Sequence, residues 1–123
     1  MPSLKPREIN FHKVSRILEL VFAEDQTFSF STEFLRVYSP SAEVQGHGPG
    51  QEVLQIGKED VNIDRIEPIG HYALKLVFDD NHESGIYSWD YFYYLGINYE
   101  EKWRQYLDRL AEGGYPHKGS NNS

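Results

Sequence analysis

The chain has 123 residues, no cysteine and a formal net charge of −7, and its aromatic residues are two Trp, nine Tyr and seven Phe. This length suits a single domain, because domains commonly contain about 100–150 residues. The lack of cysteine excludes disulfides, thiolate zinc or iron–sulfur sites and a cysteine nucleophile. The acidic balance argues against nucleic acid as a partner, since phosphate backbones are bound by basic surfaces.

The apolar runs are far shorter than the roughly 20 residues that span a bilayer. No basic segment is followed by an apolar one, so the sequence shows no signal peptide. We therefore expect no membrane association and a soluble, cytoplasmic domain.

The first third of the chain predicts a hairpin and a short helix. Residues 1–14 contain two prolines and little periodicity, which indicates a flexible arm. Apolar and polar residues then alternate on both sides of the polar segment 24–26, a pattern typical of a β-hairpin. Ser31 or Thr32 can cap a short helix that ends near Arg36.

Residues 38–50 contain three glycines and two prolines and are predicted to form a long loop without regular structure, a kind of segment that is often functional. A second group of strands follows this loop. The predicted features are a strand from Val61, a bulge near 65–66, a turn at 67–70, a strand over 72–78, a tight turn at 79–82 and a strand over 84–88.

The last third predicts two helices. Ser88 can cap a helix that begins at Trp89, and Asn98 with Glu101 forms a capping-box signal for a second helix. Gly113-Gly114 ends that helix, and residues 115–123 are predicted to be a disordered tail. An apolar stripe on the second helix comprises Trp103, Tyr106, Leu107 and Leu110.

These elements predict one α+β domain over residues 15–114. Its centre would be a small, mainly antiparallel sheet of about five strands, packed with short helices and a C-terminal amphipathic helix.

Three stretches resemble a known family: "LRVYSPSAEVQGHGPGQ", "IEPIGHYALKLVFDDNHESGIYSWDYFYYLG" and the closing "W..YL..L". They are similar to the DUF971 family, also called the γ-butyrobetaine hydroxylase-like N-terminal domain, in its stand-alone bacterial form. The resemblance covers about residues 8–114.

The resemblance implies a supporting role. In that family the domain also occurs fused in front of the catalytic jelly roll of carnitine-pathway dioxygenases, and appended to P-loop ATPases of iron–sulfur cluster assembly. The leading expectation is therefore a non-catalytic accessory domain that interacts with a protein partner. We assign no catalytic residue, because the sequence contains no nucleophile with an orienting base.

The resemblance also implies a lost zinc site. In the dioxygenases, three cysteines of a Cys-Pro-Cys-x-x-Cys run and a later histidine bind a structural zinc. Here Ser39, Ser41 and Val44 stand at the cysteine positions, and His82 matches the histidine. Two hydroxyls and an isopropyl group cannot replace three thiolates as zinc ligands, so the zinc is not carried over.

Two interpretations of His82 remain open. It either serves as a ligand or general base beside carboxylates, or is a turn histidine that hydrogen-bonds the segment at the former zinc position. The alternative functions follow from the first interpretation and from the glycine-rich loop. One is a metal-binding protein or metal-dependent enzyme that holds Fe or Zn through His47 and His82 with Asp80 or Glu43. The other is a small-ligand-binding domain with a pocket under the 39–50 loop.

The densest aromatic stretch supplies the candidate interaction surface. Residues 89–94 contain five aromatic side chains, most of which we expect in the core. Trp89, Tyr91 and Tyr94 are the candidates for contact with a partner, because Tyr and Trp are enriched at interface anchors. The same surface could also serve self-association into a homo-oligomer.

Overall fold

The computed structural model describes residues 5–45 and 53–117, and its first sheet contains strands β1 (Glu8–His12), β2 (Ile17–Val21) and β3 (Thr27–Ser31). The strands are antiparallel in the order β1-β2-β3. A short 3-10 segment, η1 (Ala23–Asp25), connects β2 to β3, which confirms the predicted hairpin. The predicted flexible arm was wrong for residues 8–12, because they pair with β2 as an edge strand.

The second sheet contains β4 (Ile63–Ile69), β5 (Ala73–Phe78) and β6 (Glu83–Ser88), antiparallel in that order. The pairing of β4 with β5 shifts register between Ile63 and Arg65, close to the predicted bulge. The turn predicted at 67–70 was placed too early, because β4 continues through Pro68 and pairs with Leu74. The tight turn before β6 has Asn81 at φ 69°, as its sequence predicts.

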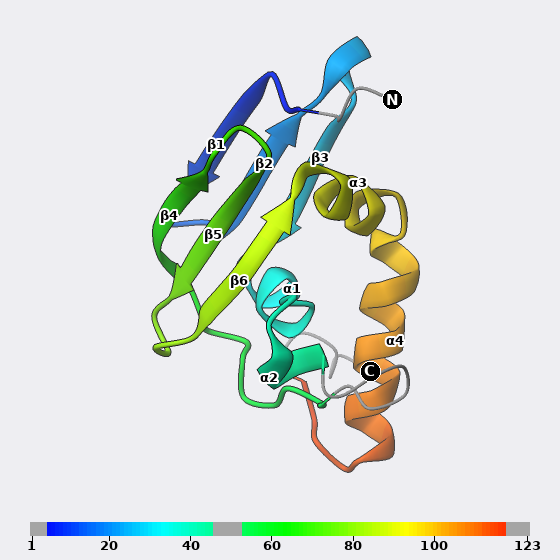
Figure 1. Cartoon of the computed structure of the whole chain (residues 1–123). Coiled ribbons are helices and arrows are strands. Elements are labelled where there is room, and N and C mark those ends of the chain that lie inside the picture. Colours follow the sequence, from blue (N-terminus) through cyan, green and yellow to red (C-terminus); the bar gives the residue numbers. More distant parts are fainter. Residues whose placement is uncertain (1–4, 46–52, 118–123) are drawn as a thin grey trace.

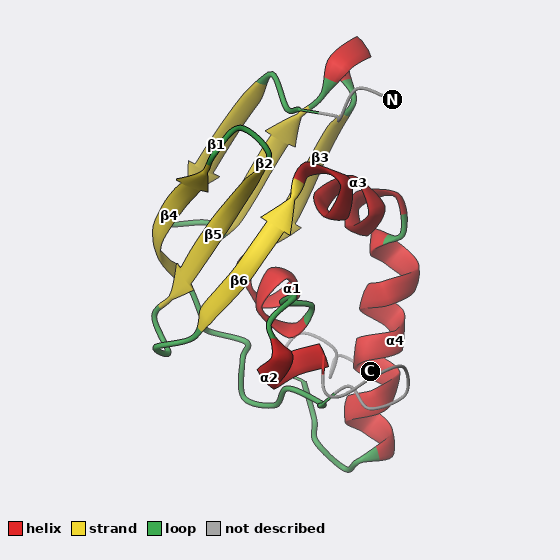
Figure 2. Ribbon diagram, in the orientation of Figure 1, coloured by secondary structure: helices red, strands yellow, loops and turns green. Residues whose placement is uncertain are grey.

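The inner faces of both sheets contribute to one core, so the predicted α+β class is confirmed. Figure 1 shows one sheet behind the other, with α3 (Trp89–Ile97) beside β3 and β6, and Figure 2 shows every helix except the short η1 gathered on the side of α3. Within the described residues there are six strands in two sheets rather than about five in one. The fully buried side chains of this core include Leu18, Leu20, Phe30, Ile63, Leu76, Phe78, Tyr87 and Phe92.

Serine caps begin two of the helices. The Oγ of Ser31 accepts from the backbone N–H of Phe34 at 3.1 Å and starts α1 (Thr32–Val37). The Oγ of Ser88 accepts from the N–H of Tyr91 at 3.1 Å and starts α3. Each hydroxyl satisfies an N–H group that has no partner within its helix, as predicted.

The segment predicted as an irregular loop over 38–50 contains a short helix, α2 (Ala42–Gln45). The N–H groups of Val44 and Gln45 both donate to the carbonyl oxygen of Ser41, which closes its single turn. Proline at position 40 precedes the helix, where no intrahelical N–H is required. The remaining residues of this predicted loop, 46–50, lie outside the described residues.

The last helix, α4 (Tyr99–Glu112), lacks the predicted capping box. The side chain of Asn98 makes no cap hydrogen bond, and its amide instead donates to the carbonyl oxygen of Tyr94 at 2.9 Å. Asn98 serves as the C-cap of α3 as well, so its side chain satisfies the preceding helix. The predicted apolar stripe is confirmed: Tyr106 and Leu110 are buried, and Trp103 and Leu107 are half-buried.

The start of the predicted disordered tail is packed against the domain. His117 is buried, and its Nε2 lies 2.7 Å from the Oε2 of Glu33, which also accepts from the Tyr106 hydroxyl at 2.7 Å. The prediction was therefore wrong for residues 115–117, while residues 118–123 lie outside the described part. No helix in the described ranges is long and apolar enough to cross a membrane.

Candidate functional site

The corner between α1 and the β5–β6 hairpin brings together three of the residues singled out from the sequence. Ser39 follows the C-terminal end of α1, Ser41 precedes α2, and His82 ends the turn before β6. Ser39 is fully buried and His82 is 4% exposed. Gly85 has φ 78°, and the backbone of Ser41 lies 3.6 Å from where a Cβ on this glycine would be. The positive φ is a conformation that favours glycine, whereas the 3.6 Å separation is an ordinary van der Waals contact.

A network of hydrogen bonds joins Ser39, Ser41, Ser84 and His82 at this corner. The Ser39 Oγ donates to the carbonyl oxygen of Ser84 at 2.9 Å and accepts from the N–H of Ser41 at 3.2 Å. The His82 Nε2 lies 3.0 Å from the Ser39 Oγ and 3.3 Å from the Ser41 Oγ. A hydroxyl has one proton, and Ser39 gives its proton to Ser84. The network therefore assigns the proton of His82 to Nε2, from which it donates to Ser39.

The Asp80 carboxylate forms ion pairs with two cationic side chains, those of Arg36 and Lys58. Its Oδ2 accepts from the Arg36 Nε at 3.0 Å and from the Lys58 Nζ at 2.7 Å. Its Oδ1 accepts from the N–H of His82 at 3.3 Å and fixes the turn. Burial raises the pKa of Asp80, but the hydrogen bonds from Lys58 and Arg36 outweigh burial and hold this pKa below its usual range. Asp80 thus joins α1 and the hairpin by a charged bridge.

The residues at this corner do not fit the zinc that the resemblance implies for its relatives. The Ser39 hydroxyl already makes three hydrogen bonds, and Val44 offers only a buried hydrocarbon side chain. Zinc sites of this kind need four nitrogen or sulfur ligands, and among the four positions Ser39, Ser41, Val44 and His82 only His82 supplies one. The arrangement matches the interpretation of His82 as a turn histidine bonded to the serine segment.

The proposed metal site of His47 and His82 is not assembled by the described residues. His47 lies outside them, and the side chain of Glu43 is not described. Within the described ranges, no group of three or more His, Cys, Asp or Glu side chains could hold a metal ion. The hypothesis of an Fe or Zn site that includes His47 therefore stays a prediction.

The three candidate interaction residues differ in exposure. Trp89 is 5% exposed, and its indole N–H donates to the carbonyl oxygen of His71 at 2.8 Å, so its assignment to an interaction surface is wrong. Tyr91 is half-buried and donates from its hydroxyl to the carbonyl oxygen of Tyr38 at 2.7 Å. Tyr94 is 47% exposed on the outer side of α3. Trp89 belongs to the buried core cluster, a long-range packing that the aromatic composition of residues 89–94 does not indicate.

A pocket of about 520 Å³ lies among α1, α2, α3 and α4. Val44, Gln45 and Val53 line it, so it lies beside the described ends of the predicted 39–50 loop. Tyr38 and the α4 residues Lys102 and Arg109 line its other walls. The sequence analysis did not single out Tyr38, Lys102 or Arg109 as site residues. The spacing of Lys102, Gln105 and Arg109 at i, i+3 and i+7 is the signal that could have placed them on one helix face.

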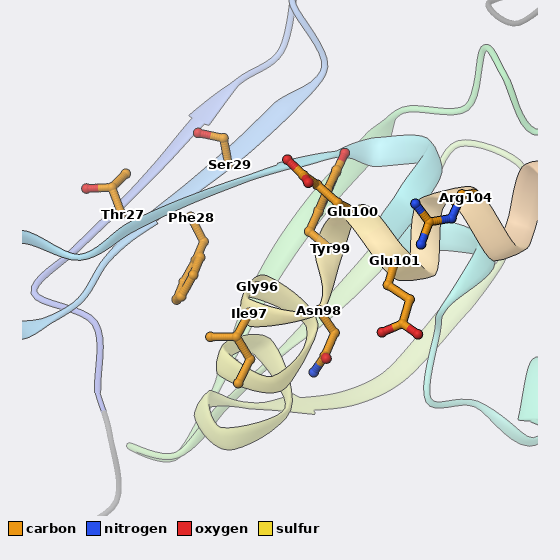
Figure 3. Close-up of a pocket in the computed structure, with 10 residues that line it drawn as sticks. All are labelled: Thr27, Phe28, Ser29, Gly96, Ile97, Asn98, Tyr99, Glu100, Glu101 and Arg104. Atoms are coloured by element: carbon orange, nitrogen blue, oxygen red, sulfur yellow. The ribbon is translucent and has the colours of Figure 1, made fainter.

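A second pocket, of about 570 Å³, lies where α3 meets α4 next to β3. Figure 3 shows the side chains around it, with Phe28 from β3 and Ile97 from the end of α3 on one side and Glu100, Glu101 and Arg104 from α4 on the other. Two carboxylates and one guanidinium make its α4 wall polar. Phe28 and Ile97 make the opposite wall apolar.

Comparisons with known proteins find relatives that span most of the chain. A family model described as gamma-butyrobetaine hydroxylase-like, N-terminal, matches residues 9–93. Two proteins with NMR solution structures are each 45% identical to the chain. The first has a TM-score of 0.80 and covers 99% of this chain and 98% of its own. The second has a TM-score of 0.78, and its match covers 95% of this chain and 89% of its own.

A crystal structure of a DUF971-family protein of unknown function from Acidithiobacillus ferrooxidans is also similar. It is 35% identical with a TM-score of 0.63, and the match covers 75% of this chain and 92% of that one. No curated protein matches the chain.

Proposed function

The chain belongs to the gamma-butyrobetaine hydroxylase-like N-terminal family, and from this membership we propose that it is a non-catalytic accessory domain that binds another protein. In fused relatives the resemblance places such a domain beside a dioxygenase or an ATPase of iron–sulfur assembly. Here the contact would form between separate polypeptides. The partner is then an enzyme that carries the chemistry, while this domain supplies a docking surface.

One observation carries the proposal: an exposed apolar ridge on α3. Tyr94 is 47% exposed and Ile97 is 59% exposed, and their spacing of three residues puts them on neighbouring positions of the helix surface. Tyr94 lines the pocket of about 520 Å³ and Ile97 lines the pocket of about 570 Å³. The ridge therefore stands between two hollows, a shape into which a partner can fit side chains of its own.

Apolar ridges of this kind suit protein interfaces. Large apolar side chains that stay exposed beside concave surfaces mark interaction sites, and tyrosine is one of the residue types enriched among interface anchors. The acidic balance of the chain, 19 Asp and Glu against 12 Lys and Arg, favours a partner with a basic rim around its own apolar patch.

The proposal is tested by site-specific photocrosslinking. The photoreactive residue benzoylphenylalanine replaces Tyr94 or Ile97 in the full chain, which is then expressed in the organism of origin and irradiated. Ile86, on β6, is the matched control because it is 47% exposed, the same fraction as Tyr94. We expect positions 94 and 97 to crosslink to one distinct polypeptide that mass spectrometry identifies, and position 86 not to do so.

Two outcomes contradict the proposal. Equal crosslinking from position 86 would show that the contacts of the α3 ridge are not specific. Crosslinking of positions 94 and 97 only to a second copy of the chain would make the ridge a homo-oligomer interface instead. Circular dichroism of each purified variant verifies that the fold is intact before the crosslinks are compared.

A further inference from the structure

Three of the four sheet edges among the described strands are covered or interrupted. The helix α3 packs beside the edge strand β3 (Figure 1). The segment before α2 lies against β6, where the Ser39 hydroxyl donates to the carbonyl oxygen of Ser84 at 2.9 Å. The strand β4 contains Pro68, which has no N–H group, and its register shifts between Ile63 and Arg65. Each of these features hinders the pairing of an edge strand with a further chain.

The remaining edge is β1, whose strand neighbour in the described sheet is β2 alone. The strand contains no proline, and its pairing with β2 runs from Glu8 to His12 without a register shift. Figure 1 shows β1 on the side of the molecule away from α3 and α4. An edge strand leaves alternate backbone N–H and C=O groups unused by its own sheet, so β1 offers a template for one more strand.

The two faces of β1 define what an added strand must carry. Ile9 and Phe11 lie opposite buried leucines of β2. Ile9 is 40% exposed and Phe11 is half-buried, so the apolar face of the sheet stays partly exposed at this edge. On the other face, the Asn10 amide donates to the Glu19 carboxylate at 3.1 Å. An added strand continues both faces if apolar and polar residues alternate along it.

Charge at the ends of β1 selects the occupant. Lys5 and Lys13 flank the strand, both are exposed, and neither forms an ion pair within residues 5–45 and 53–117. Residues 5–16 contain four basic residues and one acidic residue, although the whole chain has a formal net charge of −7. A second copy of β1 would bring these basic ends together in either orientation, and like charges on neighbouring strands destabilise their pairing. A strand with carboxylates at its ends gains attractions instead.

We infer that β1 accepts an extended segment of another protein as a further strand of its sheet, with alternating apolar and polar residues and with carboxylates at its ends. Backbone hydrogen bonds along residues 8–12 supply the attachment. Ile9 and Phe11 contact the apolar residues of the segment. Lys5 and Lys13 attract its carboxylates. This surface is separate from the α3 ridge, so the inference goes beyond the proposed function and does not depend on it.

The test is an NMR titration of the full chain with the synthetic peptide acetyl-Glu-Glu-Val-Thr-Val-Thr-Val-Glu-Glu-amide. Its valines alternate with threonines, as the two faces of β1 require, and its glutamates lie at both ends. We expect saturable shifts of the backbone amides of residues 8–12, and nuclear Overhauser contacts between peptide and β1 protons. Added salt should weaken the binding, because it screens charges at an exposed site.

Three control peptides test the backbone and the charge separately. One is N-methylated at the valines and one at the threonines. Because alternate N–H groups of a strand point to the same side, one of these two peptides should lose binding and the other should keep it. The third peptide has lysines in place of the glutamates and should bind much more weakly, since it meets the basic ends of β1.

Charge-reversal variants of the chain assign the lysines. Lys5→Glu and Lys13→Glu should each weaken binding of the acidic peptide by about threefold, since each exchanges an attraction for a repulsion at an exposed site. Arg104→Glu is the matched control: it makes the same change in net charge at an exposed position on α4, so it should leave the affinity nearly unchanged. The dispersion of the NMR spectrum verifies that each variant is folded.

Several results would overturn the inference. It fails if the acidic peptide gives no saturable shifts at residues 8–12, if both N-methylated peptides bind as well as the parent peptide, or if the lysine peptide binds equally tightly. Equal effects of Arg104→Glu and the two lysine variants would remove the role of the basic ends. The same amide shifts on raising the protein concentration without peptide would make the occupant a second copy. Because the titration contains no partner of the α3 ridge, none of these results changes the crosslinking outcome there.

Discussion

The Nε2 of His82 lies 3.0 Å from the Oγ of Ser39, which donates its own proton to the carbonyl oxygen of Ser84 at 2.9 Å. One serine hydroxyl thus joins the end of α1 to both the turn and the first residues of β6. His82, which the family resemblance matches to a zinc-ligand histidine, is here part of a hydrogen-bonded joint between two segments that are distant in sequence.

Ser39→Ala should destabilise the domain more than Ser41→Ala does. Removing the Ser39 hydroxyl leaves buried groups of His82 and Ser84 without that partner, at a cost of about 1–3 kcal/mol in the free energy of unfolding. The Ser41 hydroxyl is half-buried and lies at the longer distance of 3.3 Å, so its loss should cost about 1 kcal/mol or less. Urea denaturation of the two variants measures the difference. Equal midpoints would show that the Ser39 hydroxyl is not the central group of the joint.

Introducing three thiols should create a zinc site at the same corner. In the variant Ser39→Cys, Ser41→Cys, Val44→Cys, two of the new sulfurs start from positions whose side chains already contact His82. Position 44 is one helical turn away, with its N–H bonded to the carbonyl oxygen of Ser41. Three thiolates and one imidazole satisfy the ligand preference of zinc. We expect one equivalent of zinc by elemental analysis and a raised unfolding temperature when zinc is present.

The control for this prediction adds His82→Gln to the triple variant. If His82 is the fourth ligand, the quadruple variant should bind zinc more weakly and gain less thermal stability from it. Zinc binding that is unaffected by His82→Gln would show that the imidazole does not point to the engineered ligands.

Local patterns predicted the elements of this fold better than their assembly. Alternation around residues 24–26 and the capping serines Ser31 and Ser88 depend on neighbours within four residues, and the structure confirms all three. The strand over residues 8–12 exists because β2 offers a free edge, a long-range contact that its own composition does not indicate. His117 likewise packs against Glu33, which is 84 residues earlier.

The candidate site was likewise predicted only in part from the sequence. The family motif pointed to Ser39, Ser41 and His82, and these residues do lie together. The pocket with Lys102 and Arg109 was missed because three helices and the end of α1 build it, and each contributes only a few residues. Such a site can be identified only when the three-dimensional packing of the helices is known.

The bridge from Asp80 to Arg36 and Lys58 should make stability depend on pH in the acid range. The folded-state pKa of Asp80 is lowered, so its charged form stabilises the fold above the ordinary pKa range near 4, and this contribution is lost as pH falls through the folded value. Asp80→Asn should lower the free energy of unfolding by about 2 kcal/mol at pH 7, because buried Arg36 loses its carboxylate. The deficit relative to the unmodified chain should shrink as the pH is lowered below 4.

Glu67→Gln is the matched control for this prediction, because Glu67 pairs with Arg65 at an exposed site. Exposed pairs contribute about 0–1 kcal/mol, so this variant should change stability little at any pH. Denaturant titrations at pH 7, 5 and 3 compare the three proteins. A deficit of Asp80→Asn that stays constant over this range would exclude the carboxylate charge as its cause.

The close approach of α3 to β3 depends on Gly96. A Cβ on this glycine would lie 2.5 Å from atoms of the Phe28 ring, closer than side chains approach in folded proteins. Alanine in place of a helical glycine ordinarily stabilises by about 1 kcal/mol, whereas an overpacked contact costs about 1–3 kcal/mol. We therefore expect Gly96→Ala to destabilise the chain in urea. Combining it with Phe28→Leu, which shortens the obstructing side chain, should recover part of the loss, because the two changes act on one contact. If the two effects simply add, the helix is not held against β3 by this contact.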